Sequence, residues 1–135
     1  MQHILVDTGA WYAYMDKDDP DHERVAEVLE AHYPLLLTTD FIADEALTLL
    51  RYRAGRNAAV RFGELLYSGT LCRLEYITKA DQQKAWALFL KYSDHCFSFT
   101  DCTSFIVTQR LQIGTAIAID SDFRAYGLHC LPVNP

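Results

Sequence analysis

The sequence predicts an α/β fold in which helices cover a parallel sheet. Short apolar runs, each long enough for one strand, alternate with longer stretches in which apolar residues recur at helical spacing. This alternation is typical of parallel strands joined by helices. The chain of 135 residues fits one domain, 1–135, and half of its residues are hydrophobic, which is enough to fill a core.

Five apolar runs are the candidate strands. They cover 4–6, 35–38, 71–77, 116–119 and, as a short edge strand, 131–133. Pro132 falls in the last of these, and an edge strand tolerates a residue that has no backbone N–H.

Helices are expected wherever caps and periodicity coincide. Asp19-Pro20 offers an N-cap followed by proline at the first helical position, and Thr39 or Asp40 offers a second cap. Gly55 and Gly114 are stop signals. We therefore expect helices over 20–31, 40–53, 57–67, 79–91 and 101–112, and a short one that ends at Tyr126.

Composition limits the functional classes. The net charge of −6 counts mildly against a nucleic-acid substrate, unless metal ions neutralise the phosphates at the site. The four cysteines have no zinc-binding spacing, so we expect buried, reduced thiols; they are Cys72, Cys96, Cys102 and Cys130. The sequence shows no signal peptide and no stretch as long as a membrane span, so we expect a cytoplasmic protein without membrane contact.

Two aspartates follow buried strands directly. Asp7 follows the run 4–6, and Asp120 follows Ile117-Ala118-Ile119. Ligands of open parallel sheets bind at the carboxyl ends of the strands, so both acids are candidates for a site. The alternative for each is a helix cap, which is a common role for aspartate at such a turn.

Glu45 lies on or beside the apolar stripe of its helix. Ile42 and Leu49 are three and four residues away and should face the core. A buried glutamate needs a partner or a metal ion. The alternative is that Glu45 sits at the edge of the stripe and reaches solvent.

Asp101 opens a helix, where capping is its alternative role. Thr100 is another candidate cap, and it would leave Asp101 free to point outward. Asp122 forms an Asp-Ser-Asp run with Asp120, and it is either a further acid of the site or only a first-turn acid of the last helix.

Converging carboxylates would repel one another and require a cation. Ligand sets made only of oxygen favour Mg²⁺ or Mn²⁺, and such ions activate water and stabilise the charge that develops when a phosphodiester is cleaved. The sequence contains no G-x-x-x-x-G-K-[ST], G-x-G-x-x-G, G-x-S-x-G or H-E-x-x-H motif. His22 and His95 are candidates near the site, although a solvated surface position is the better interpretation for both.

Four short segments together resemble the PIN-domain ribonucleases, and among these the VapC-type toxins of bacterial toxin–antitoxin pairs. They are Ile4 to Ala10, Asp40 to Glu45, Ser98 to Ser104 and Ile119 to Phe123, in the order and at the spacing typical of the family. The resemblance covers nearly the whole chain.

The resemblance implies a three-layer α/β/α fold with a parallel sheet in the order 3-2-1-4-5, which places Asp7 beside Asp120. It implies an endoribonuclease that uses Mg²⁺ or Mn²⁺, with catalytic acids Asp7, Glu45, Asp101 and Asp120, of which Asp7, Asp101 and Asp120 bind the metal. Thr8 and Thr100 match supporting positions, and Asp122 matches a position that is acidic in only some members. The resemblance also implies an RNA substrate, a cognate antitoxin protein and a homodimer.

Arginines and aromatic residues near these segments each have more than one interpretation. Arg51, Arg53, Arg56 and Arg61 would either hold an RNA backbone or form a solvated helical face. The aromatic residues Trp11, Tyr12 and Tyr14 would stack on bases, contact a partner or belong to the core.

Other α/β proteins with aspartates at strand ends fit less well. A phosphoacceptor signalling domain needs an aspartate directly after a central strand and a late lysine, yet 71–77 is followed by no aspartate before Asp81 and no lysine follows Ile119. A haloacid-dehalogenase-like phosphatase would open with the Asp-x-Asp motif that here comes near the end. A PIN nuclease that is not a toxin, and a PIN-like binding module without catalysis, remain open alternatives.

Overall fold

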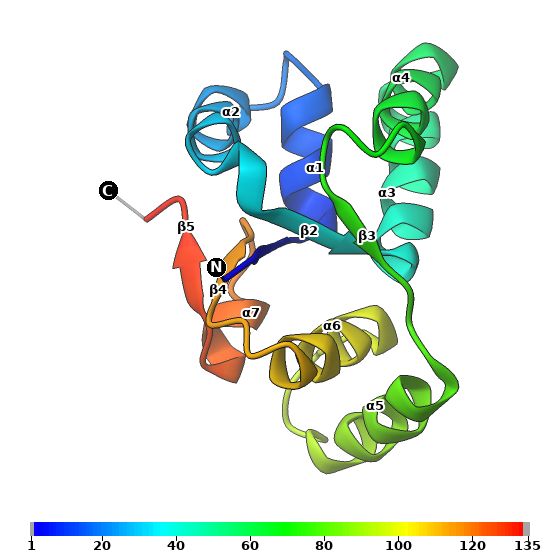
Figure 1. The fold of residues 1–135 in the computed structure, drawn as a ribbon, viewed down its shortest axis with the longest axis vertical. Helices are drawn as coiled ribbons and strands as arrows, with labels where there is room; N and C mark the ends of the chain where they lie inside the picture. The colour runs from blue at the N-terminus through cyan, green and yellow to red at the C-terminus, as the bar shows by residue number, and fades with distance from the viewer. Residues whose placement is uncertain (1, 134–135) are drawn as a thin grey trace.

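The computed structural model describes residues 2–133, and its strands lie in one sheet (Figure 1). The strands are β1 (Ile4–Val6), β2 (Leu36–Thr39), β3 (Arg73–Glu75), β4 (Thr115–Ile117) and β5 (His129–Leu131). The helices are α1 (Thr8–Met15), α2 (His22–Ala31), α3 (Asp40–Arg53), α4 (Arg56–Tyr67), α5 (Lys79–Lys91), α6 (Phe99–Arg110) and α7 (Asp122–Tyr126), and a 3₁₀ helix, η1, covers Tyr33–Leu35.

All neighbouring strands are parallel, and their order is β3-β2-β1-β4-β5, as predicted. Helices α1 to α4 lie on one face of the sheet and α5 to α7 on the other (Figure 1). The chain passes from β1 outward to β3 and then crosses back to β4, so the strand order reverses between β1 and β4. That reversal creates the kind of crevice at the carboxyl ends of the strands in which α/β proteins bind ligands.

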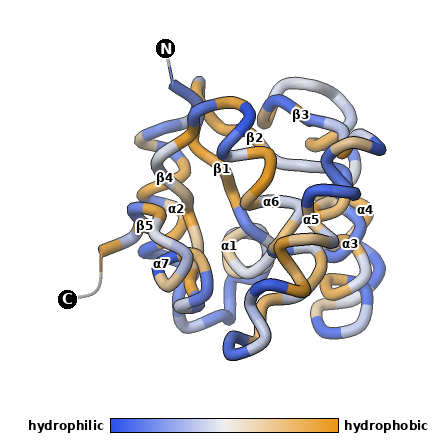
Figure 2. Tube along the Cα trace, turned by 90° about the horizontal axis from the view of Figure 1, so that it is seen from below, coloured by the Kyte–Doolittle hydropathy of each residue, from blue (hydrophilic) through white to orange (hydrophobic). Residues whose placement is uncertain are grey.

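The core is centred on β1, whose residues are all buried. Figure 2 shows hydrophobic residues along β1 and through the middle of the molecule, with hydrophilic stretches on the outside. Trp11 of α1 is fully buried, packs on Phe62 with ring centroids 5.4 Å apart, and donates from Nε1 to Thr38 Oγ1 at 3.0 Å. Trp11 is therefore a core residue, as one of the sequence interpretations had it.

Several predicted strand limits were wrong. Leu35 belongs to the 3₁₀ helix rather than to β2, and the run 71–77 contributes only Arg73–Glu75 to the sheet. The strand predicted at 116–119 ends at Ile117. The edge strand lies at His129–Leu131 instead of 131–133, and Pro132 follows it because a proline has no N–H to donate to the sheet.

Two predicted helix starts were also wrong. Asp19 and Pro20 lie in a turn, because the Asp19 side chain accepts a hydrogen bond from Asp21 N at 2.8 Å, and α2 begins only at His22. Helix α6 begins at Phe99 and ends at Arg110, and Gln112, not Gly114, has the positive φ after it.

The predicted cap and stop of α3 are confirmed. Thr39 caps the helix by accepting from Ile42 N at 3.1 Å, and Gly55, with φ of 101°, follows its end.

The cysteines are all free, as predicted. Cys72, Cys102 and Cys130 are buried, but Cys96 is exposed in the turn that follows α5, so the expectation of burial was wrong for that residue.

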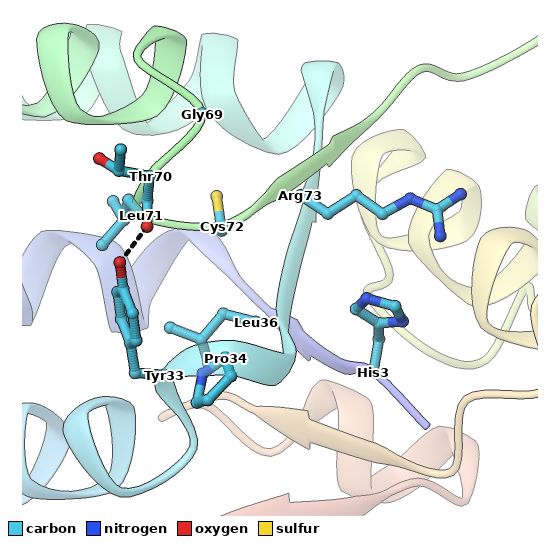
Figure 3. Close-up of a pocket in the computed structure, with 9 residues that line it drawn as sticks. All are labelled: His3, Tyr33, Pro34, Leu36, Gly69, Thr70, Leu71, Cys72 and Arg73. Atoms are coloured by element: carbon cyan, nitrogen blue, oxygen red, sulfur yellow. Dashed lines mark hydrogen bonds between the residues drawn. The ribbon is translucent and has the colours of Figure 1, made fainter. Parts of the chain in front are cut away.

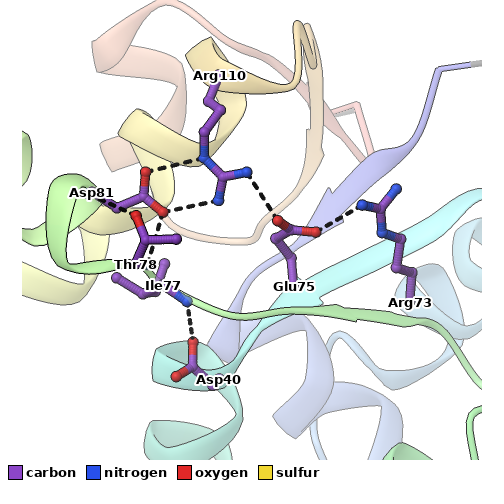
Figure 4. Close-up of polar contacts among 7 residues, drawn as sticks. All are labelled: Asp40, Arg73, Glu75, Ile77, Thr78, Asp81 and Arg110. Atoms are coloured by element: carbon purple, nitrogen blue, oxygen red, sulfur yellow. Dashed lines mark hydrogen bonds and ion pairs between the residues drawn. The ribbon is translucent and has the colours of Figure 1, made fainter.

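An ion-pair network fixes α6 against α5 and β3 (Figure 4). Arg110, the last residue of α6, donates from Nε and Nη2 to the two carboxylate oxygens of Asp81 at 3.0 and 2.8 Å, and from Nη1 to Glu75 at 2.9 Å. Asp81 also accepts from Thr78 N in the capping box of α5. Burial alone would raise the pKa of Asp81, but the bonds from Arg110 and Thr78 outweigh it and lower that pKa.

Breaking this network should destabilise the protein. Replacing Asp81 by Asn removes the charge that Arg110 faces at a position only 2% exposed, and we expect the free energy of unfolding in urea to fall by about 2 kcal/mol. The variant Asp21→Asn breaks the more exposed Arg24–Asp21 pair and should cost less than about 1 kcal/mol. Equal losses in the two variants would show that the network does not fix α6.

Candidate active site at the carboxyl edge of the sheet

Asp7 is the most buried acid at the carboxyl edge of the sheet. It follows β1, its backbone N–H donates to Ile117 O at 3.0 Å, and its residue exposure is only 4%. Asp7 occupies the N-cap position of α1, but in the described part of the chain its side chain accepts no capping hydrogen bond of the kind seen at Thr39 or Ser98.

The pKa of Asp7 is raised well above its usual range. Burial is the largest cause, and the charges of Asp101, Asp120 and Glu45 raise it further, against a hydrogen bond from the Thr8 backbone that lowers it. The structure thus brings the four predicted acids close enough for their charges to interact, although they come from four separate segments of the chain.

Glu45 is exposed, so the interpretation that placed it among the buried residues of α3 was wrong. The core positions of that helix are Ile42, Ala43, Ala46 and Leu50. Glu45 lies at the edge of this stripe, and its Oε1 accepts a hydrogen bond from Thr8 Oγ1. Thr8 therefore holds the Glu45 carboxylate toward the end of β1, beside Asp7.

Asp101 is part of a capping box at the start of α6. Its backbone N–H donates to Ser98 Oγ at 2.9 Å, and its Oδ2 accepts from Ser98 N at 3.0 Å. Ser98, not Thr100, is the cap. The capping role is thus correct for Asp101, yet the pKa of Asp101 is raised to about 6, by burial first and then by the charges of Asp120 and Asp122. Capping orients this acid and leaves it facing the others.

Asp120 and Asp122 lie beyond the end of β4 rather than directly on it. Asp120 is exposed, and its Oδ1 accepts from Asp122 N at 3.0 Å. Asp122 begins α7, and burial and the charge of Asp120 raise its pKa, while hydrogen bonding with Asp101 and the charge of His95 lower it. Asp122 is therefore both a first-turn acid and a neighbour of Asp101, and His95 lies close to the same cluster.

The chemistry of the donor set suits a hard divalent cation, because the groups are carboxylates and burying a carboxylate in the charged form requires a positive partner. In residues 2–133, however, no three His, Cys, Asp or Glu side chains already stand in an arrangement that could hold a metal ion. Binding an ion would therefore require the carboxylates to turn toward one another. The exposed Asp120 and Glu45 are the acids with room to do so.

The remaining predicted residues make no hydrogen bond to these acids within residues 2–133. Arg51, Arg53, Arg56 and Arg61 are exposed on α3 and α4. Tyr12 donates to Asp16 at 2.8 Å, and His22 Nδ1 lies 2.8 Å from Ala13 O, so both make local contacts in the α1–α2 region.

Two surface pockets, one far from the acids and one beside them, differ in their lining residues. Figure 3 shows a hollow at the amino ends of β1, β2 and β3, where Tyr33 donates to Thr70 O. Its basic lining residues are His3 and Arg73. It lies at the edge of the sheet opposite Asp7, and its lining contains no acid. A second pocket lies beside Glu45 and Thr100. Of these two edges of the sheet, the carboxyl edge is therefore the one that carries the acidic side chains.

The clustered acids predict a specific pH dependence in metal-free protein. Because the folded-state pKa values of Asp7 and Asp101 are raised, their stabilising contribution is complete below the unfolded pKa, about 4, and is lost as the pH rises through the folded values, about 6 for Asp101. After chelation, the protein should melt a few degrees higher at pH 5 than at pH 7. Asp101→Asn should show a smaller difference, and equal differences in the two proteins would contradict this assignment.

Among the helices of the described residues, none is long and apolar enough to span a membrane.

The PIN domain family profile matches residues 4–128. The 23S rRNA-specific endonuclease VapC20 of Mycobacterium tuberculosis is 33% identical over 124 residues, covering 92% of this chain and 94% of that protein. Ribonuclease VapC26 of the same species is 25% identical, covering 87% and 86%.

Two solved structures share the fold. The crystal structure of Mycobacterium tuberculosis VapC20, described as a sarcin–ricin loop cleaving toxin, superposes with a TM-score of 0.90 at 32% identity and covers 98% of this chain and 99% of that one. FitAcB from Neisseria gonorrhoeae has a TM-score of 0.64 at 15% identity, with 94% and 95% covered, and supports the fold alone. With this fold, and with a family profile that spans almost all of its length, the chain belongs to the PIN-domain family.

Proposed function

We propose that this protein is a metal-dependent endoribonuclease and the toxin of a toxin–antitoxin pair. The observation that carries the proposal is the burial of Asp7 beside the charges of Glu45, Asp101 and Asp120. The names of its relatives VapC20 and VapC26 support RNA as the substrate and hydrolysis as the reaction.

Asp7, Asp101 and Asp120 would hold the ion, Mg²⁺ or Mn²⁺, through their carboxylate oxygens. When bound, the ion lowers the pKa of a water molecule and stabilises charge on the cleaved phosphate. The chain itself orients the groups. The capping box holds Asp101 through Oδ2, which accepts from Ser98 N. Asp120 accepts from the backbone N–H of Asp122, the first residue of α7.

Glu45 is the acid suited to handle a proton. Thr8 occupies its Oε1, so Oε2 is left to orient the attacking water or to accept its proton. The exposed Arg51, Arg53 and Arg56 would contact the RNA backbone, which offsets the net negative charge of the chain near the substrate. A homodimer and a cognate antitoxin protein complete the proposal by family resemblance.

Replacing single acids of the site should slow cleavage strongly without unfolding the protein. Asp7→Asn and Asp101→Asn keep the side-chain shape but lose the charge, and we expect RNA cleavage to fall at least a hundredfold, while Glu45→Gln should lose about tenfold or more. Cleavage of labelled RNA with Mg²⁺ or Mn²⁺ measures this. The control is Asp18→Asn, an exposed acid in the turn after α1, which should cut like the wild type. A variant of Asp7 that cuts RNA at the wild-type rate would refute the assignment.

The toxin role has its own test. Expression of the protein alone should arrest bacterial growth, and Asp7→Asn expressed at the same level should not. Normal growth in cells that contain active, RNA-cleaving protein would instead identify a PIN nuclease that is not a toxin.

A further inference from the structure

A pocket of about 350 Å³ lies directly beside the acidic cluster, against α3 and the first turn of α6. Its lining is Asp44, Glu45, Thr48, Leu49, Tyr52 and Thr100. The α3 members recur at spacings of three and four residues, so they share one face of that helix. Ile42, Ala46 and Leu50 face the core instead. Glu45 and Thr100 connect the pocket to the proposed cleavage site.

The lining matches a nucleobase better than a phosphate. Two carboxylates, those of Asp44 and Glu45, would repel an anion. Leu49 gives an apolar surface, and Tyr52, a residue that is 85% exposed, carries a ring on which a base can stack. The volume lies near the lower end of the range of small-ligand sites, roughly 300–1,000 Å³, as suits a single base.

We propose that this pocket binds one base of the RNA, next to the cleaved phosphodiester, and selects guanine. Tyr52 stacks on the base, and Asp44 accepts hydrogen bonds from the adjacent N1–H and N2–H groups. Guanine alone among the RNA bases presents two such donors side by side, which a carboxylate can accept with both oxygens. Uracil has one N–H between two carbonyl oxygens, and those oxygens would face the carboxylates.

The position along α3 supports a flanking nucleotide. Tyr52 comes seven residues after Glu45, which is about 10 Å along the helix axis. A base stacked there would belong to a nucleotide near the one whose phosphate meets Asp7 and Asp101. The inference rests on the proposed endoribonuclease function and adds the residues that choose the sequence.

The test is cleavage of a randomised single-stranded RNA library with Mg²⁺, followed by sequencing of the new ends. The wild type should enrich guanine and deplete uracil at one position beside the cut. Asp44→Asn should lose that preference at the same position and keep cutting, because an amide offers a donor beside its acceptor and no longer matches guanine. An Asp44→Asn variant with the wild-type preference would overturn the proposal.

The role of Tyr52 in binding is tested by measuring KM and kcat separately on one RNA. Tyr52→Ala should raise KM roughly tenfold, the effect expected for losing one stacked base, with kcat changed much less. Tyr52→Phe keeps the ring and should restore KM. The matched control is Tyr33→Ala, which removes an exposed tyrosine at the opposite edge of the sheet and should leave KM unchanged.

The outcomes separate the two proposals. A wild type that cuts no RNA in the library refutes the endoribonuclease function itself. A wild type that cuts, with Tyr52→Ala indistinguishable from it in KM and base preference, refutes only the base pocket. If Tyr52→Ala cuts normally but binds a neutralising protein partner more weakly, the pocket is a protein contact and the guanine proposal is wrong.

Discussion

One carboxylate of this protein is buried where three others act on it. Asp7 is 4% exposed, and the charges of Asp101, Asp120 and Glu45 act on it together. Burying a charge without a partner is costly, and each added negative charge increases the cost. A fold selected only for stability would place an apolar residue at that position. The arrangement makes physical sense if a cation binds there.

The fold is organised to bring these acids to one place. The reversal of strand order between β1 and β4 puts the end of β1 beside the segment that carries Asp120. Helix α6 delivers Asp101 from the other face of the sheet, and the Arg110–Asp81–Glu75 network fixes the far end of that helix. Thr8 ties Glu45 of α3 to the end of β1. Each acid therefore has a separate structural element that orients it.

Much of this arrangement could be predicted from sequence, for definable reasons. The strand 4–6 is a continuous apolar run, and a parallel strand buried on both faces produces that pattern. The limits of α3 and α5 are confirmed because threonine caps mark their starts. The strand order came from family resemblance, since periodicity carries no information on which strands are neighbours.

Other features were not predictable from local patterns. Helix α1 escaped detection because Trp11 and Ala13 are buried on different sides of it, so it shows no polar face. Glu45 borders the apolar stripe of α3, and its exposure depends on whether neighbouring elements of the fold cover that border. Asp81 and Arg110 are 29 residues apart, and only the fold brings them together.

The capping box of Asp101 was missed although its signal was present. Ser98 and Asp101 have the Ser-x-x-Asp spacing of a helix start, and the same spacing recurs at Thr78 and Asp81. Capping and participation in a site were treated as alternatives for Asp101. The structure combines them, because one oxygen of Asp101 accepts the capping bond while the charges of Asp120 and Asp122 act on the same carboxyl group.

A cation site formed by these carboxylates is tested by the melting temperature of chelated protein as Mn²⁺ is added, for the wild type and for Asp7→Asn. An ion that binds only the folded state stabilises it by about 2.7 kcal/mol at a hundred times its dissociation constant, which corresponds to several degrees in a domain of this size. The wild type should melt progressively higher as Mn²⁺ is added. Asp7→Asn should melt above the wild type without metal, because a buried repulsive charge is gone, and should gain less from Mn²⁺. A wild-type melting temperature that does not move up to millimolar Mn²⁺, in folded protein, would contradict a cation site formed by these carboxylates.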